Sequence, residues 1–248
     1  MVEFFNIFRD YGILLLVGQY PNGPLGGLAV TFILAVLGIL LAFPLGVLLA
    51  LGRVSPFKAL YWPATVVVYV MRGMPLLMLI FWVYFFLPVL TGQPVSGFTT
   101  MLVTMALYQG SYMAEILRAG IEGLHKGQME AARALGLSYP QAMRKVILPQ
   151  AIFNMVPAML SQFVSTIKET SLGYVISVNE VTFAASQVSG ILLTKPFQVY
   201  AVLTVIYFVL CFSLTQLARH LEHRVTRRRA GGGPLILGSV TSQGKLQT

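Results

Sequence analysis

Five long apolar stretches, separated by more polar segments, dominate the pattern of hydrophobic residues along the chain. They are residues 28–51, 59–89, 98–117, 151–178 and 197–218. The first has 24 residues and no charged side chain, and about 20 apolar residues are enough for an α-helix to cross the hydrocarbon of a bilayer. The pattern predicts an all-α membrane protein with about five transmembrane helices, and this odd number places the two termini on opposite sides.

The second apolar stretch contains a group of residues that interrupts a straight span. Arg72, Gly73 and Pro75 occur in its middle, and proline and glycine are common at helix kinks. We expect either a bend at this point or a division into an interfacial segment and a true span. Pro44, inside the first stretch, predicts a milder kink.

The polar insert at 118–150, between the third and fourth stretches, begins with the pattern of a short helix. Residues 128–135 are rich in good helix formers. Gly136 follows directly, at a position where helices commonly end in a residue of left-handed conformation. The sequence therefore predicts a helix and a glycine turn.

A second helix of the insert follows this turn. Ser138 or Tyr139 can serve as its N-cap, and Pro140 is tolerated in its first turn. The helical pattern continues over residues 141–148, until Pro149 interrupts it. The insert is therefore expected to fold as helix, turn and helix.

The first insert helix carries small side chains that suit contact with another protein. Ala131, Ala132 and Ala134 leave its surface flat, so a partner can approach its backbone closely. Glu130 and Arg133 supply charge at the margin of this surface. We interpret the helix as a docking element.

Composition also places the chain in a bilayer. Of its 248 residues, 56% are hydrophobic and only 10% are charged, and the mean hydropathy is +0.77, whereas soluble domains carry about 25% charged residues. The single cysteine, Cys211, has no intrachain partner, and no Cys/His cluster has the spacing of a metal site. We expect no metal and no cofactor.

Lysine and arginine are distributed very unevenly between the two faces that the five stretches define. Thirteen belong to one face and two to the other. The first set is Arg53, Lys58, Arg118, Lys126, Arg133, Arg144, Lys145, Arg219, Arg224, Arg227, Arg228, Arg229 and Lys245, and the second is Arg9 and Lys195. Loops rich in lysine and arginine stay in the cytoplasm. We therefore expect residues 1–27 to lie outside the cytoplasm, residues 28–218 to form the transmembrane domain, and both the insert and the tail 219–248 to be cytoplasmic, with the Gly-rich tail largely disordered.

Taken alone, the insert also looks like a helix-turn-helix that reads DNA, and a formal net charge of +9 would suit phosphate contacts. Membrane topology accounts for that surplus of positive charge. An apolar stretch also begins directly after Pro149. We therefore expect no binding of nucleic acid.

The insert contains a motif that is specific to one family. The motif consists of Glu130, Ala131, Ala132, Gly136 and, after nine further residues, the run Val-Ile-Leu-Pro at 146–149. It resembles the EAAxxxGx9IxLP motif of the permease subunits of bacterial ABC importers, with Val146 in place of the isoleucine. Three further stretches are similar to those of the polar amino-acid uptake subfamily, the histidine, glutamine and glutamate type. These stretches are 71–88, 111–121 and 167–178.

This resemblance implies a set of partners in the bacterial inner membrane. They are a second permease subunit, identical or homologous, two ATP-binding subunits in the cytoplasm, and a periplasmic protein that delivers the amino acid. Glu130, Ala131, Ala132, Gly136 and Pro149 would then belong to the region that couples the permease to the ATPase.

The chain itself is not expected to be an enzyme. It contains no GxxxxGK[ST] loop to hold nucleotide phosphates, so ATP hydrolysis is expected in a separate chain. The alternative function is a secondary transporter or channel that works without ATP.

Four charged residues lie within or at the ends of the apolar stretches, where a charge costs about 2.5 to 3.5 kcal/mol on insertion scales. They are Arg72, Glu115, Lys168 and Glu169. Together with Thr170 they are candidates to line a substrate pathway, because the carboxylate and ammonium of an amino acid would pair with such groups. The alternative is structural pairing. We favour pairing for Glu115, with Arg118 at i, i+3, and both roles stay open for Arg72 and Lys168.

Overall fold

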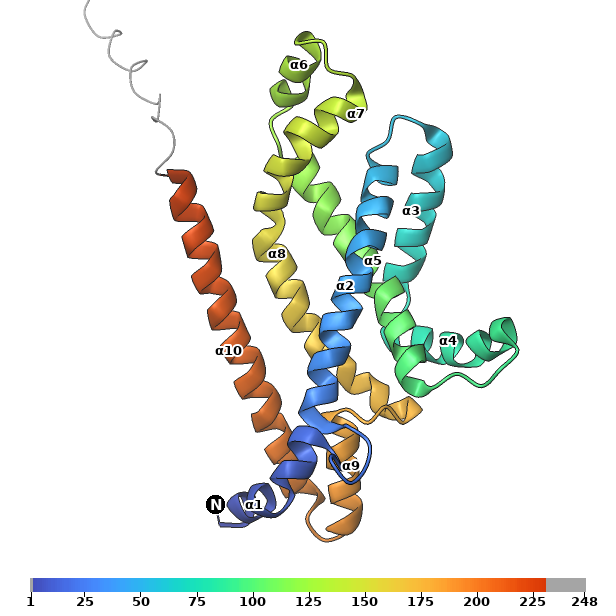
Figure 1. Ribbon diagram of the computed structural model, residues 1–248, viewed down its shortest axis with the longest axis vertical. Helices are drawn as coiled ribbons and strands as arrows, with labels where there is room; N and C mark the ends of the chain where they lie inside the picture. The colour runs from blue at the N-terminus through green and yellow to red at the C-terminus, as the bar shows by residue number, and fades with distance from the viewer. Residues whose placement is uncertain (1, 231–248) are drawn as a thin grey trace, which may run out of the picture.

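The computed structural model describes residues 2–230 and shows an elongated bundle of helices (Figure 1). The helices are α1 (Val2–Val17), α2 (Gly27–Arg53), α3 (Lys58–Gly73), α4 (Leu76–Thr91), α5 (Gly97–Glu122), α6 (Gly127–Ala134), α7 (Tyr139–Ala142), α8 (Leu148–Glu169), α9 (Val181–Ile191) and α10 (Pro196–Ala230). A π turn, Met143–Ile147, joins α7 to α8, and a 3₁₀ helix, Thr170–Ile176, follows α8. Within the described range only two isolated β-bridges occur and no strand, so the all-α prediction is confirmed.

Three helical runs are long and apolar enough to cross a membrane. They are α2, the run Tyr139–Ile176 that includes α8, and the part Pro196–His220 of α10. Neither α3 nor α4 is long enough to cross a membrane alone, but together they could form one span that is bent by 110°. The remaining predicted span corresponds to α5, which is long enough but carries buried polar side chains such as Thr100, Thr104 and Gln109, and it does not meet the same test of apolarity.

The bend between α3 and α4 has a local cause. Met74 has extended backbone, with φ −100° and ψ 142°, because the ring of Pro75 disfavours helical conformation in the residue before it. The interruption predicted at Arg72, Gly73 and Pro75 is therefore a sharp bend rather than a mild one.

The sequence indicated that the second helix of the insert ends at Pro149, but the structure shows that it continues past this residue. A straight α-helix there would bring the proline ring against the carbonyl four residues earlier. The π turn widens the helix immediately before this point, with the Leu148 N–H donating to the Met143 carbonyl. Pro149 then occupies the first turn of α8, and the run from α7 through α8 is continuous.

Two helices lie at the end of the bundle opposite the insert, and the hydrophobic pattern did not predict them. Helices α1 and α9 pack there against the start of α10 (Figure 1), around buried residues that include Ile7, Leu15, Val181 and Val199. At the other boundary, α10 continues to Ala230 and so includes the first part of the segment expected to be a disordered tail. Residues 231–248 lie outside the described range.

The most extensive helix contact in the described chain joins α2 to α5, which lie side by side along much of their length. Gly46 of α2 faces Met113 of α5 so closely that a Cβ added at Gly46 would be 2.6 Å from the Met113 Cβ. Gly38, two turns earlier, has more room, because its added Cβ would be 3.4 Å from the Met105 Cβ. Gly46 therefore sets the approach of the two helices.

We predict that Gly46→Ala destabilises the protein by about 1–3 kcal/mol, the usual cost of adding atoms to a well-packed core. Gly38→Ala is the matched control, and we expect it to be neutral or slightly stabilising because alanine favours the helix. Thermal unfolding of the two variants in the same detergent checks this. Equal melting temperatures would contradict the packing described at Gly46.

Candidate functional site

The insert at one end of the bundle contains a sharply ended helix (Figure 1). Gly136 has φ +83°, as predicted from its position. Its N–H donates to the Arg133 carbonyl at 3.0 Å, and the N–H of Leu137 donates to the Ala132 carbonyl at 3.2 Å. These two hydrogen bonds form a Schellman motif, in which the left-handed residue satisfies carbonyl groups at the end of the helix.

The chain is fastened on both sides of the next turn. The Ser138 N–H donates to Oε1 of Gln141 at 2.9 Å, as in a capping box. The hydroxyl of Tyr139 donates to the carbonyl of Val54, at the end of α2, at 3.0 Å. The insert is therefore joined to α2 by a hydrogen bond and to α8 through the π turn.

The outward surface of α6 differs from the one expected. Ala132 is buried, with only 4% exposed, and so does not face a partner. Ala131 and Ala134 are exposed, and the side chain of Leu135 is 84% exposed. Leu135 could have been found from the sequence, because it is the large apolar residue directly before Gly136, at the predicted end of the helix. Glu130 is also exposed.

Pro149 lies at the other end of the connection, at the start of α8, where it is exposed. It is separated from α6 by α7 and the π turn. Pro149 is therefore part of the connection between the insert and α8.

The charged residues at membrane depth do not converge on one site. Glu115 of α5 pairs with Arg118 one turn away, as expected, and also with Arg53 of α2 and, at 3.3 Å, with Arg72 of α3. The guanidinium of Arg72 also lies over the ring of Tyr112, 5.1 Å from its centroid. Glu115 and Arg72 are thus engaged with each other in a network that joins three helices.

A second polar network forms near the middle of α5. The side-chain amide of Gln109 donates to Glu169, and the amide of Gln162 donates to Oε1 of Gln109 at 2.6 Å. Thr170 is buried and donates to the carbonyl of Ile167 at 2.7 Å. The side chains of Gln109, Glu169 and Thr170 therefore each already have a hydrogen-bond partner within the chain.

Lys168 differs from the other three charges. It is exposed and, in the described part of the chain, forms no salt bridge. With Ser161 and Ser165 it lies on one face of α8, where these residues line a cleft of about 280 Å³ against Thr215 and Arg219 of α10. This face of α8 is polar at membrane depth.

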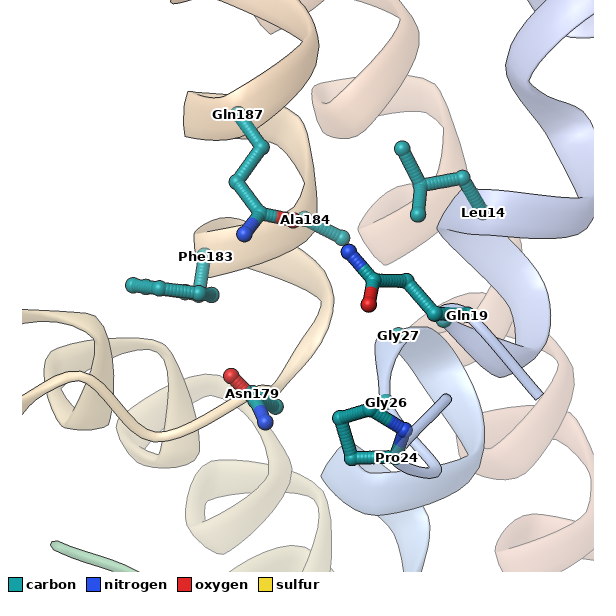
Figure 2. A pocket seen from close by; sticks show the side chains of 10 residues that line it. Leu14, Gln19, Pro24, Gly26, Gly27, Asn179, Phe183, Ala184 and Gln187 are labelled. Atoms are coloured by element: carbon teal, nitrogen blue, oxygen red, sulfur yellow. The ribbon is translucent and has the colours of Figure 1, made fainter. Parts of the chain in front are cut away.

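The end of the bundle opposite the insert holds a small cavity of about 80 Å³ between the α1–α2 connection and α9. The side-chain amides of Gln19 and Gln187 point toward one another there, and Asn179 lies at the margin (Figure 2). Each water needs about 10–15 Å³ of such space, so the cavity suits a few waters and is too small for an amino acid.

Glu180, at the start of α9, is a fully buried acid that the sequence analysis did not single out. Its carboxylate accepts from the N–H groups of Thr182 and Phe183, both at 2.8 Å, and from the hydroxyl of Tyr207 at 3.2 Å. Burial raises the pKa of the Glu180 carboxyl to about 7, and these hydrogen bonds oppose that rise. Glu180 caps α9 and fastens it to α10, which is a structural role.

The residues that the structure describes contain no candidate metal-binding site. No group of three or more His, Cys, Asp or Glu side chains lies close enough to hold an ion. In the polar networks described above, each glutamate is surrounded by arginine, glutamine or tyrosine and not by further acids or histidines.

Comparison with known proteins agrees with the fold and the motif. Residues 42–227 match the family described as binding-protein-dependent transport system inner membrane component. A probable glutamine ABC transporter permease of Bacillus subtilis is 37% identical over 197 residues, which are 79% of this chain and 90% of that protein. A glutamate transport system permease of Corynebacterium glutamicum is 38% identical over 208 residues, covering 83% of this chain and 76% of that one.

Among solved structures, an amino acid ABC transporter crystallised with histidines is similar over 90% of this chain and 96% of its own, with a TM-score of 0.75 and 31% identity. The matched helices include the insert and the spans that flank it. The chain therefore belongs to the family of binding-protein-dependent transport system inner membrane components, the multi-pass permeases of ABC importers.

Proposed function

We propose that the chain is the permease subunit of an ATP-driven importer of a polar amino acid and forms the translocation pathway with a second permease subunit, identical or homologous. The observation that carries this proposal is the insert, a short helix ended by a positive-φ glycine and joined stiffly to α8. The relatives' names, which refer to glutamine and glutamate, support an amino acid as the substrate.

The insert is suited to transmit movement from two ATP-binding subunits. Helix α6 offers Ala131, Ala134 and Leu135 to a partner surface, with Glu130 at the margin. Movement of α6 passes to α8 through the continuous run Tyr139–Ile176. A periplasmic binding protein would deliver the amino acid at the opposite end.

The polar face of α8 is the best candidate to line the pathway. Its membrane-spanning run and that of α10 are each only 17% buried within the chain. The exposed face of α10 is apolar, with Val205, Phe208 and Phe212, and suits lipid. The exposed residues of α8 include Ser161 and Lys168 as well as the apolar Ile152 and Phe153. A charged group such as Lys168 at membrane depth requires a polar partner or a water-filled cavity.

Within this pathway Lys168 would bind the carboxylate of the substrate. It is the candidate that remains accessible, whereas Arg72, Glu115 and Glu169 are held by partners within the chain. Thr170 is buried, so we assign it a structural role.

The proposed orientation places the insert in the cytoplasm and α1 and the α9–α10 connection outside, because the insert carries the excess of lysine and arginine. Cysteines introduced at Gln128 and Leu193, in a Cys211→Ser background, test this. Both sites are exposed. We expect an impermeant thiol reagent added outside intact cells to label Leu193→Cys only, and labelling of both sites would contradict the orientation.

We predict that Lys168→Met assembles normally but lowers substrate uptake at least tenfold, which corresponds to about 1.4 kcal/mol of lost interaction. Substrate-stimulated ATP hydrolysis by the complex should fall with it. Lys58→Met, an exposed cation outside the α8 face, is the control and should transport normally. Wild-type uptake by the Lys168 variant would remove Lys168 from the pathway, and uptake without ATP would favour a secondary transporter.

We predict that Gly136→Val uncouples the permease from its ATPase. An added Cβ at Gly136 meets no atom within 4 Å, so the cost is in the backbone, where φ +83° is strained for valine. The variant should reach the membrane in normal amounts, lose transport and retain less ATPase on copurification.

Two further variants separate the backbone effect from other causes. Gly136→Asn should keep most of the coupling, because asparagine tolerates the left-handed region. Gly190→Val introduces the same side chain into open space at a residue without positive φ, and it should behave as wild type. If Gly136→Val matches wild type in both assays, the turn does not couple the subunits.

A further inference from the structure

A cleft of about 550 Å³ opens at the insert end of the bundle, between the end of α2, the start of α3 and the insert. Its polar lining includes Arg53, Ser55, His125 and Lys126, and its apolar lining includes Ile121 and Met143. The volume falls in the range of about 300–1,000 Å³ that is usual for small-molecule sites. The α6 residues proposed to contact the ATPase and the proposed pathway residue Lys168 do not line it.

Arg53 lines this cleft and has a hydrogen-bond donor that no described group of the protein accepts. Its side chain is only 6% exposed. One of its terminal nitrogens pairs with Glu115, and its guanidinium lies over the ring of Tyr69. Its Nε, however, is buried and has no hydrogen-bond partner. A buried guanidinium with an unused donor favours an anion nearby.

The neighbouring polar groups also present donors. The Gly127 N–H donates to Nδ1 of His125 at 3.1 Å, so in the neutral ring the proton is on Nε2, which remains able to donate. The hydroxyl oxygen of Ser55 accepts from the Phe57 N–H at 3.2 Å, and its hydrogen is still available. The carboxylate of Glu122, which also lines the cleft, is engaged by Arg118.

The charges around the cleft leave a positive surplus. The ion-pair network beside it contains three arginines and two glutamates, a sum of one positive charge. Its members are Arg53, Arg72, Arg118, Glu115 and Glu122. Lys126 adds a second positive charge without a salt bridge in the described residues. The cleft therefore attracts anions.

We propose that this cleft binds the phosphate of an anionic phospholipid, with the first part of an acyl chain against its apolar wall. The start of α3, which borders the cleft, exposes large apolar side chains: Phe57 at 68%, Leu60 at 56% and Trp62 at 60%. Aromatic residues at the end of a membrane span mark the level of the lipid headgroups. The anionic lipids of the cytoplasmic leaflet attract lysine and arginine side chains that lie near the membrane surface.

Such a lipid would join two elements that move relative to each other during coupling. Its phosphate would lie between Arg53, in the last turn of α2, and Lys126, at the start of α6. The proposal makes the position of the insert sensitive to the anionic lipid content of the membrane. It concerns lipid binding and does not depend on which solute is transported.

The test uses the fluorescence of Trp62 to report on lipid at the cleft. Tyr61 lines the cleft, and the centroids of the Tyr61 and Trp62 rings are 5.7 Å apart. The chain has two tryptophans, so Trp82→Phe leaves Trp62 alone. This chain is purified without its partners, so that no other tryptophan contributes, and is placed in nanodiscs of phosphatidylcholine. Brominated phosphatidylglycerol or brominated phosphatidylcholine is then included at matched mole fractions. We expect the anionic lipid to quench Trp62 at a mole fraction about fivefold lower, from the usual strength of one basic residue near anionic lipid.

The double variant His125→Gln, Lys126→Gln should abolish this preference, and Lys58→Gln, an exposed cation nearby that does not line the cleft, should keep it. Both sets of changes are at exposed positions. Equal quenching by the two lipids, or a preference that survives the double variant, would overturn the proposal. Loss of the preference in millimolar inorganic phosphate, but not in chloride of equal ionic strength, would assign the site to a free anion instead and overturn the lipid assignment.

Discussion

The arrangement of the membrane helices around the insert depends on the carboxylate of Glu115. It forms ion pairs with arginines on three helices, Arg53 of α2, Arg72 of α3 and Arg118 of α5. Charges in a membrane protein are tolerated when they are paired, and removing one partner of a buried pair typically costs about 3–5 kcal/mol. Without Glu115, three guanidinium groups would repel one another at a helix junction, so this one acid fixes how α2, α3 and α5 meet.

Lys168 is the feature of α8 that a lipid environment alone does not explain. Helix α10 exposes phenylalanine and valine beside polar residues such as Ser213, and α8 exposes Ile152 and Phe153 beside Ser161 and Lys168. The two helices pack side by side, and Lys168 lines the cleft between them. A charge at membrane depth requires a polar partner or a water-filled cavity, and the proposed pathway between this chain and a second permease subunit would provide one.

Much of this organisation could be predicted because each signal was local. Gly136 ends its helix with positive φ, and the pairing of Glu115 with Arg118 follows from their spacing on one helix. The bend at Pro75 follows from a single ring. Local chemistry of this kind does not depend on how distant segments pack.

Other features could not be predicted because they depend on tertiary contacts. Helix α1 is stabilised by packing against α9 and α10, although Arg9 and Asp10 interrupt its apolar pattern. Ala132 looks like a surface residue in the sequence and is buried by the fold. The pairing of Glu115 with Arg53 joins residues 62 positions apart, a separation at which the sequence alone carries no geometric information.

The π turn before Pro149 has a mechanical consequence. Because it keeps α7 and α8 in one run of 38 residues, a rise of about 1.5 Å per residue makes the run roughly 55 Å long. A tilt of about 5° at the insert would then displace the far end by roughly 5 Å, enough to open or close a passage the width of a side chain. A flexible break at Pro149 would absorb the same tilt locally, so the widened turn keeps the helix continuous between the insert and α8.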